Sequence, residues 1–327
     1  ECDNSSGDNC IQDGNVMRKY IIQRFLQLIP ILIGITFLSF AMMRVAGSDA
    51  VTEMYENRGT AVSQEIIDAK KAELGLDQPF LVQYVSWLNG FLHGDMGTSY
   101  VSGKKVFDEF VSKLPATLLL TVMSILATVV ISIPLGVLAA VCQDKWVDLL
   151  LRFFSFIGNA MPNFFVAMLL MQLLSIKLNL LPVIASGVNI RSALMPMLTL
   201  AISMSAKYTR QVRNAVLEEL RQDYVIGARM RGIKESVILW RHVLPNAMLP
   251  IVTLLGLSLG SLLGGTAVVE IIYNWPGMGS MAIKAIACRD YPMVQAYVLM
   301  IAIMYMVINI IVDLSYTYLD PRIKEVK

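Results

Sequence analysis

Few residues of this 327-residue chain combine the type and spacing that chemistry requires. Carboxylates inside apolar segments are the usual sign of a proton or ion relay, and two occur here. Glu270 lies at one end of its apolar segment, and Asp313 follows Asn309 by one helical turn. Both positions fit the anchoring of a helix end, or a pair between helices, better than a relay. A transporter driven by ions would bury carboxylates near the middle of the membrane, and the first four apolar segments contain none.

Metal, thiol and nucleotide chemistry find little support in the sequence. The chain has only two histidines, His93 and His242, and its four cysteines (Cys2, Cys10, Cys142 and Cys288) show neither metal-ligand spacing nor a disulfide framework. His-Glu-x-x-His is absent, which argues against an intramembrane metalloprotease. No glycine-rich loop ends in Gly-Lys-Ser/Thr, so the chain has no nucleotide site of its own. We therefore expect a separate ATPase to supply the energy of any active transport.

Composition places the chain in a membrane, because 56% of its residues are hydrophobic, only 16% are charged and the mean hydropathy is +0.60. A helix needs about 20 mostly apolar residues to cross the hydrocarbon layer. Such segments predict an all-α integral membrane protein with six transmembrane helices, at Ile21–Met43, Ala116–Val141, Phe153–Ile176, Leu194–Ala206, Leu249–Glu270 and Pro292–Leu314.

The cations indicate the orientation of these helices. Lys and Arg precede the first segment, recur in the second connection, number eight between Lys207 and Arg241, and close the chain. The positive-inside rule then places both termini and the loop 207–246 in the cytoplasm. The long loop 44–113 is expected outside.

The terminal residues and the long outer loop are read as follows. Residues 1–16 are polar and acidic, which fits a disordered extension or a cloning scar, and residues 17–327 form the transmembrane domain. In the loop 44–113, we expect a surface helix at Thr60–Leu74, ended by Gly75 in a left-handed cap. A second helix is expected at Phe80–Leu88, lying against the membrane through its aromatic residues. The loop could meet a soluble partner outside.

Glycines recur about every four residues along the fifth segment, at Gly256, Gly260 and Gly264. Small residues on one stripe let another helix approach closely. The pattern is compatible with ordinary packing within the subunit, or with a pore lined by these glycines and a partner's matching helix.

The polar segment Lys207–Asn246 interrupts two apolar ones and has helical pieces of its own. We expect one helix to continue through Ala215–Leu220, a second at Val225–Arg231 stopped by Gly232, and a third from Ile233 to His242. Small Ala228 would let a partner's surface come close. The cations Arg229, Arg231 and Lys234 could pair with acidic groups of that partner.

The order of residues in this segment resembles the "EAA" loop of ABC importer permeases, whose pattern is Glu-Ala-Ala, three residues, Gly, nine residues, Ile, any residue, Leu-Pro. Ala228, Gly232, Leu244 and Pro245 agree with it, whereas Ile226, Gly227 and His242 differ. Further segments resemble the dipeptide/oligopeptide/nickel branch of these permeases: Leu74–Pro79, Gly94–Ser99, Leu114–Leu118, Asp223–Val225, Glu270–Gly279, Arg289–Pro292 and Leu319–Arg322. Gly47–Ala50 departs from the Gly-Asp-Pro usual after the first span.

The resemblance implies a type I importer fold and a set of partners. These are a second, homologous permease in a heterodimer, two cytoplasmic ATPases that use ATP and Mg, and an extracytoplasmic substrate-binding protein. The chain would lie in a bacterial inner membrane, bind no cofactor or metal itself and contact no nucleic acid. The implied ATPase-coupling residues are Tyr224, Ala228, Arg229, Arg231, Gly232, Leu244 and Pro245.

A second set of residues is expected at the outer mouth or against the binding protein. It comprises Glu270, Trp275, Pro276, Gly277 and Asp290, with a rigid turn that merely joins helices as the alternative for 275–277. The short connection 177–191, Leu81–Tyr84 and Arg241-His242 resemble nickel-type members. We therefore expect nickel as the cargo, chelated by a small molecule, with a dipeptide or oligopeptide as the alternative. A passive channel or receptor is the reading from a different class.

Overall fold

The structure is a computed structural model of the chain, and it describes residues 26–27, 29–45, 51–52, 55, 62–73 and 75–319, without the side chains of 261, 265 and 313–319. The predicted extension 1–16, the start of the first span, the departure at 47–50 and the C-terminal cations lie outside the described residues. In the described part, all regular structure is helical except for an isolated antiparallel bridge between Thr98 and Lys105.

The chain divides into two compact units. Unit 1 holds residues up to 109 together with 285–311, and unit 2 holds residues 110–284 and the chain from 312 onward. Each is described by itself.

Unit 1 contains the apolar helix Ile29–Val45 and two helices of the long loop, α3 (Gln64–Glu73) and α4 (Phe80–Leu92). It also holds the first part of α14 (Tyr291–Leu319). Both predicted loop helices are confirmed, although α3 starts later and α4 runs one turn further than expected. Gly75 has a φ of 66°, and its successor Leu76 donates its N–H to Lys71 O at 2.9 Å, which is the expected left-handed cap.

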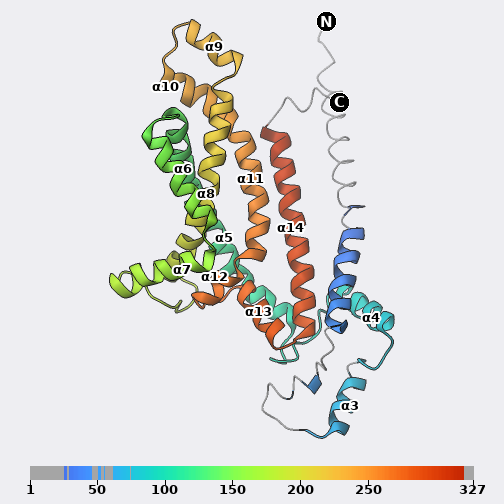
Figure 1. The fold of residues 1–327 in the computed structure, drawn as a ribbon. Helices are drawn as coiled ribbons and strands as arrows, with labels where there is room; N and C mark the ends of the chain where they lie inside the picture. The colour runs from blue at the N-terminus through green and yellow to red at the C-terminus, as the bar shows by residue number, and fades with distance from the viewer. Residues whose placement is uncertain are drawn as a thin grey trace, which may run out of the picture. The chain divides into compact units, whose positions relative to one another are not determined.

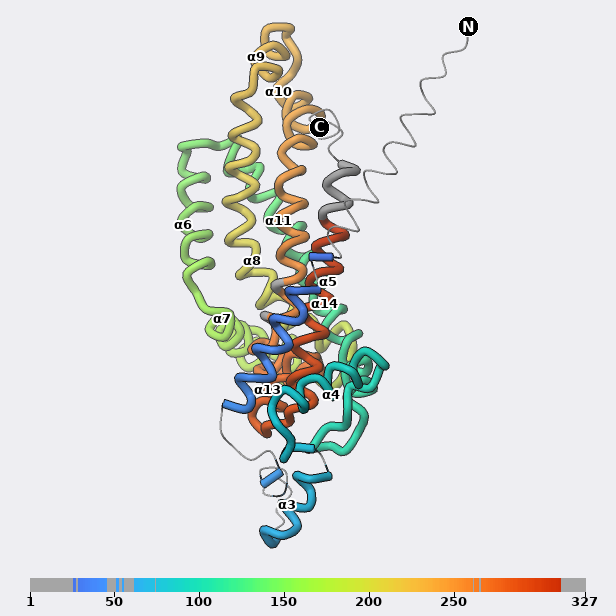
Figure 2. The backbone as a smooth tube through the Cα atoms, turned by 90° about the vertical axis from the view of Figure 1, so that its right-hand side faces the viewer, coloured from blue at the N-terminus to red at the C-terminus, as the bar shows by residue number. Residues whose placement is uncertain are grey.

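Unit 2 is a set of long helices with short ones at either end (Figures 1 and 2). The helices α5, α6, α8 and α11 run along one another, while α9 and α10 lie at one end and α7 and α12 at the other. The bounds are α5 Val106–Val141, α6 Trp146–Ala160, α7 Asn163–Leu170, η1 Met171–Lys177, α8 Ile190–Glu219, α9 Asp223–Met230, α10 Glu235–Val237, η2 Ile238–Val243, α11 Leu244–Gly265, α12 Ala267–Ile272 and α13 Met278–Ala287.

The third predicted span is not one straight helix. The chain bends by 105° between α6 and the helix Asn163–Lys177. Met161 has an extended backbone (φ −80°, ψ 130°) because the ring of Pro162 disfavours the helical conformation in the residue before it. The expectation of a continuous span over Phe153–Ile176 is therefore wrong.

The other spans differ in length from the prediction. Three described helices are long and apolar enough to cross a membrane (Val106–Val141, Glu235–Gly264 and Tyr291–Val312), or four if the bent pair counts as one. The fifth span ends before Glu270, which belongs to the separate helix α12, and the fourth is extended in α8 as far as Glu219. The total of six spans and the side of each terminus remain predictions.

Two hydrophobic cores hold unit 2 together. One joins the start of α5 to α7, α8 and α12 around Leu120, Ala167 and Trp275. The other joins the end of α5 to α8, α9, η2 and α11 around Val212, Val225 and Ile238. The helix bundle is therefore packed at both of its ends.

Candidate functional site

The polar loop 207–246 folds into the three helical pieces that its sequence predicts. The helix α8 extends over the predicted piece Ala215–Leu220 and ends at Glu219, one residue short of the prediction. The helix α9 begins at Asp223, and the chain then leads back to α11 through α10 and η2. Tyr224 holds the start of α9, because its hydroxyl donates to Glu219 Oε2 at 2.6 Å and accepts from Asn246 Nδ2 at 3.3 Å. The short helix is thus tied to the ends of both neighbouring long helices.

The inner face of α9 is part of the core of unit 2. Val225 is fully buried, and Ala228 is 9% exposed in the same cluster as Ile238 of η2. A small residue at 228 lets α9 pack against its own protein. Ala228 was expected to let a partner's surface come close. This reason for a small residue is wrong, because the side chain of Ala228 faces inward.

The outer face of α9 is apolar and uncovered by the described residues. Tyr224, Ile226 and Met230 are exposed, and Met230 exposes 81% of its area. Sequence reasoning marked Ile226 as a position where this chain departs from the motif and has its own version of the contact, but it did not single out Met230. The spacing along the helix was the available signal. Ile226 and Met230 are four residues apart and share one face, whereas the buried residues Val225 and Ala228 are three apart and share another.

The segment 232–245 leads from α9 back to α11, and the Gly and Leu-Pro positions of the motif lie at its two ends. Gly232 has a φ of 73°, a conformation that costs other residues about 1–2 kcal/mol, and it ends α9. The helix is wound as a π-helix over 238–243, directly before Pro245, whose missing N–H and ring disturb the normal ladder of hydrogen bonds. Leu244 is half-buried and packs against the inner core.

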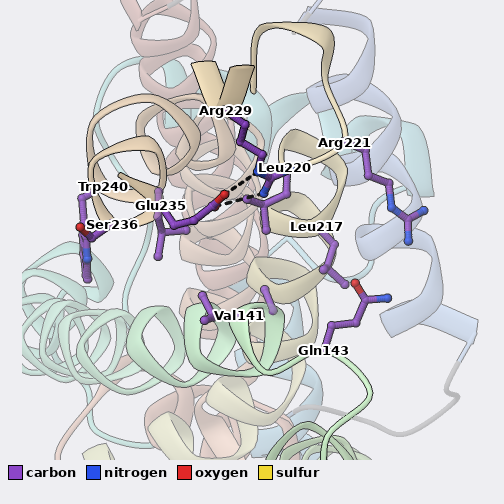
Figure 3. A pocket seen from close by; sticks show the side chains of 11 residues that line it. Val141, Gln143, Leu217, Leu220, Arg221, Arg229, Glu235, Ser236 and Trp240 are labelled. Carbon is purple, nitrogen blue, oxygen red and sulfur yellow. Dashed lines mark hydrogen bonds and ion pairs between the residues drawn. The ribbon is translucent and has the colours of Figure 1, made fainter. Parts of the chain in front are cut away.

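A pocket of about 660 Å³ lies between this loop and the ends of α5 and α8 (Figure 3). Arg229 and Glu235 are joined across part of its lining, with Arg229 Nε at 2.6 Å from Glu235 Oε1, and this hydrogen bond raises the pKa of Arg229. Arg229 is thus already paired within the loop, whereas Arg231 and Lys234 are exposed and make no ion pair with any described residue. The remaining lining residues are Ala140, Val141, Gln143, Leu217, Leu220, Arg221, Ser236, Leu239 and Trp240.

A buried ion pair fixes α6 against α8 below the loop. Asp148 is fully buried, and its two carboxylate oxygens accept from Arg213 Nε at 2.6 Å and Nη2 at 2.7 Å. The backbone N–H of Asp144 donates to Asp148 Oδ2 at 3.0 Å, and Arg152 Nε lies 3.5 Å from Oδ1. The planar guanidinium matches both oxygens, so this contact sets the position and rotation of α8. Sequence reasoning did not identify it.

At the other end of unit 2, Glu270 is a buried structural anchor. Its carboxylate accepts from the hydroxyls of Thr117 at 2.9 Å and Thr266 at 3.1 Å, and from the N–H of Ser280 at 2.8 Å. These contacts join α5, α12 and α13. The alternative of a helix-end anchor for Glu270, rather than a relay, is thereby confirmed.

The segment 273–280 forms a rigid turn around that anchor. Trp275 is buried and its indole N–H donates to Ala116 O at 3.1 Å, while Tyr273 contacts Ala167 O and the hydroxyl of Thr199 at 3.0 and 2.9 Å. A Cβ on Gly277 would lie 2.3 Å from Glu270 Oε1, so this position requires glycine. Glu270, Trp275 and Gly277 contact their own chain here and offer no surface to a binding protein. The rigid-turn alternative describes them better, and Pro276 is half-buried in the same turn.

Asp290, in unit 1, plays a similar structural part. It is 2% exposed, and its carboxylate accepts hydrogen bonds from the hydroxyl of Ser99 and, at 3.1 Å, from the N–H of Tyr100. Burial raises the pKa of Tyr100 to about 12, which keeps the phenol neutral. Two segments singled out in the sequence, 94–99 and 289–292, are thus fastened to each other, and Asp290 is not exposed for a direct partner contact.

The glycines of α11 differ in their surroundings. A Cβ on Gly256 would lie 2.3 Å from Val312 Cγ2, whereas one on Gly264 would meet nothing within 4 Å, and Gly260 is buried. Gly256 therefore serves packing within the chain, and a pore-lining role for the stripe remains a prediction. The letters Gly-x-Ser-x-Gly occur over 256–260, but they lie within a helix and not at a strand-to-helix turn, so they form no nucleophile elbow.

The described residues contain no cluster of three or more His, Cys, Asp or Glu that could hold a metal ion. The geometry supports a mechanical role: α9 is a short helix with an exposed outer face, and its inner face is packed against three longer helices, α5, α8 and α11.

The family comparison agrees with this arrangement. Residues 132–325 match the model for the binding-protein-dependent transport system inner membrane component, and residues 17–121 match the N-terminal model of such membrane components. The chain belongs to this permease family. It is a transport subunit of an ABC importer and not an enzyme, and it is a multi-pass protein of the inner membrane.

Named relatives cover the permease along nearly all of its length. It is 39% identical to the oligopeptide transport system permease protein AppB of Bacillus subtilis (strain 168), over 94% of this chain and 100% of that protein. It is 35% identical to the glutathione transport system permease protein GsiC of Salmonella typhimurium (strain LT2), over 94% of this chain and 99% of that protein. Membership in the family implies ATPase subunits and a substrate-binding protein as partners.

A solved structure shows the same fold at low sequence identity. The MetNI methionine ABC transporter in an inward-facing conformation matches with a TM-score of 0.54 and 19% identity, over 64% of this permease and 96% of that chain. This likeness supports an all-helical ABC importer permease fold.

Proposed function

We propose that α9 is the segment through which ATP hydrolysis by a separate subunit moves the membrane helices. The observation that carries this proposal is the two-sidedness of α9. Its outer residues Ile226 and Met230 are exposed and apolar, whereas Val225 and Ala228 lie in the core shared by α5, α8 and α11.

Force applied to the outer face has a direct path into the bundle. Well-packed cores shift between discrete arrangements instead of deforming continuously, so α9 moves together with the helices that surround Val225. Tyr224 adds polar ties to α8 and α11, and the Asp148–Arg213 pair carries the displacement of α8 to α6. A docked ATPase pair that closes on ATP would then rock the bundle between two states.

This proposal includes the topology and the assembly of the transporter. The loop 207–246 lies in the cytoplasm, and the chain pairs with a second, homologous permease that presents its own loop to a second ATPase. The cation distribution supports this orientation. A substrate-binding protein delivers cargo at the opposite face.

The test of coupling changes one residue of the outer face of α9 and the glycine turn that ends this helix. Met230→Glu and Gly232→Arg are made in the full transporter, with Val188→Glu as the control, since Val188 is exposed and precedes α8 at the end of that helix away from α9. Insertion and complex formation should persist in all three. Substrate-stimulated ATP hydrolysis should fall at least about tenfold in the α9 variants, a coupling loss of about 1.4 kcal/mol. Unchanged stimulation in both α9 variants would refute the proposal.

The cargo we propose is a short peptide. The relatives reported above are named for oligopeptide and glutathione transport, and this favours the peptide alternative over the expected nickel.

Uptake by cells that express the complete transporter distinguishes the two cargoes. Labelled di- to pentapeptides and glutathione are compared with labelled nickel, each with and without a chelating small molecule. Peptide uptake that depends on the chain and is competed by unlabelled peptide supports the proposal. Uptake of chelated nickel, without any peptide uptake, would contradict it.

A further inference from the structure

Helix α4 carries no charged residue, and its side chains fall into three stripes. Successive residues of a helix are about 100° apart, so residues spaced three, four and seven apart share a face. One face is aromatic (Phe80, Tyr84, Trp87 and Phe91), the next is aliphatic (Leu81, Val85, Leu88 and Leu92), and the third is mostly polar (Ser86, Asn89 and the following His93, with the exposed Val82 among them).

The aromatic stripe is occupied by the protein itself. The ring of Phe80 lies 5.6 Å from Phe37 and 5.3 Å from Phe40, in edge-to-face contacts with the helix 29–45. The hydroxyls of Tyr84 and Thr36 are 2.9 Å apart, within the same contact. Figure 1 shows α4 beside the C-terminal part of this blue helix. The expectation that α4 meets the membrane through its aromatic residues is therefore wrong.

These contacts fix the level of α4 along the first apolar helix. They begin at Thr36, which is about 13 Å before Val45, the last described residue of that helix. At that end, Arg44 donates a hydrogen bond to the side-chain oxygen of Gln83. A guanidinium at the end of an apolar helix extends to the headgroup level. The helix α4 consequently lies alongside the last turns of this helix and not beyond it.

The aliphatic stripe has no cover among the described residues. Leu81 exposes 63% of its area, Val85 61% and Leu92 75%. A face of this kind, at this level and next to a polar stripe, is typical of helices that lie in a membrane interface.

We propose that α4 is an interfacial helix whose aliphatic stripe rests in the acyl chains of the bilayer, with its polar stripe toward the headgroups and water. The lipid contact fixes the loop 62–105 at one level relative to the bilayer. It thereby positions the loop for a molecule that approaches this face of the transporter. A soluble partner is disfavoured as the occupant, because the stripe lies at the depth of the span and has no charge to orient a docking protein. The identification of this face as the extracytoplasmic one rests on the proposed topology. The proposed lipid contact does not depend on that topology.

The test places a fluorophore on each stripe. Single cysteines at Val85 and Ser86 are introduced into the full transporter, with serine at Cys2, Cys10, Cys142 and Cys288, and labelled with bimane. The complex is reconstituted into vesicles of phosphatidylethanolamine and phosphatidylglycerol. Quenching is measured with a phospholipid that carries a nitroxide near the start of an acyl chain, and separately with aqueous iodide.

The label at 85 should be quenched several-fold more by the nitroxide lipid than by iodide, and the label at 86 should show the reverse. Quenching at 85 by iodide alone would mean that the stripe faces water or a soluble partner. Quenching by neither agent would mean that the second permease covers it. Either result overturns the proposal. Because a transporter with uncoupled α9 would still give the expected pattern, this outcome is independent of the coupling and cargo tests.

Discussion

The hydroxyl of Thr117 donates to Glu270 Oε1 at 2.9 Å and accepts from the N–H of Met278 at 2.8 Å, which joins α5, α12 and α13 through one oxygen. The helix α5 is distant in sequence from α12 and α13, and the contact is fully buried. A buried carboxylate is tolerated only where such donors surround it.

Removal of that hydroxyl should destabilise the permease. Thr117→Val keeps the shape but deprives both Glu270 and Met278 of a partner, so we expect a loss of about 1–3 kcal/mol in the free energy of unfolding. Thr121 lies one turn further along α5, is also buried, and its hydroxyl has no hydrogen-bond partner among the described residues. Thr121→Val is therefore the matched control and should change stability by less than about 0.5 kcal/mol. The measurement is thermal survival of the purified complex on size-exclusion chromatography, and equal effects of the two variants would contradict the assignment.

The Asp148–Arg213 pair should respond asymmetrically to substitution. Arg213→Ala removes the bidentate partner of a buried carboxylate and leaves it the longer contact with Arg152 at 3.5 Å, for which we expect a loss of about 3 kcal/mol. Arg210→Ala, on the same helix but exposed, should have little effect. Denaturant unfolding of the purified complex measures both. The double variant Asp148→Asn with Arg213→Gln should recover part of the loss, and no recovery would mean that the pair is not the cause.

Close packing predicts opposite outcomes for two helix glycines. A Cβ at Gly136 would lie 2.5 Å from Val212 Cβ and 2.8 Å from the backbone oxygen of Thr209, so Gly136→Ala should force α5 and α8 apart. We expect it to cost about 1–3 kcal/mol through overpacking. Gly264→Ala meets open space in the described structure and should be neutral or slightly stabilising. The amount of folded complex per cell, read by in-gel fluorescence of a fusion, compares them, and a tolerated Gly136→Ala would show that the helices are not in this contact.

The contact of Asp290 with Ser99 and Tyr100 predicts a protected loop. Asp290→Ala removes the acceptor that fastens residues 99 and 100, and Lys104 and Lys105 lie exposed in the same loop. Trypsin should then cleave at these lysines several-fold faster in the detergent-solubilised complex. Asp108→Ala, an exposed carboxylate in α5, serves as the control and should leave the cleavage rate unchanged. Equal cleavage of Asp290→Ala and the unmodified chain would show that the contact does not order the loop.

Several features were predictable because their causes are local. The pieces of the loop 207–246 follow from Gly232, which adopts a left-handed backbone at no steric cost, and from Pro245, which is tolerated in the first turn of a helix. The helices α3 and α4 follow from the periodicity of their apolar residues and from Gly75 between them. The break of the third span at Pro162 was equally local, and the apolar run around it hid the signal.

Other features could not be predicted because they depend on which residues meet. Ala228 was assigned to a partner's surface, since the sequence gives the phase of a short helix but not the direction in which its faces point. Glu270 and Asp290 were assigned to surface contacts, although both are buried among donors from distant segments. The pairing of Asp148 with Arg213 had no signal in the sequence, because nothing in the spacing of α6 and α8 sets their alignment.

The sequence by itself determined the membrane class, the helical pieces of the coupling loop and the permease resemblance, since composition, periodicity and turn chemistry act over a few neighbouring residues. Only the tertiary structure decided that α9 turns Val225 inward and Met230 outward, that a threonine of α5 secures Glu270, and that α4 presents leucines, not aromatic rings, on its open face. Those outcomes depend on long-range packing, in which each side chain is placed by residues far away in the chain.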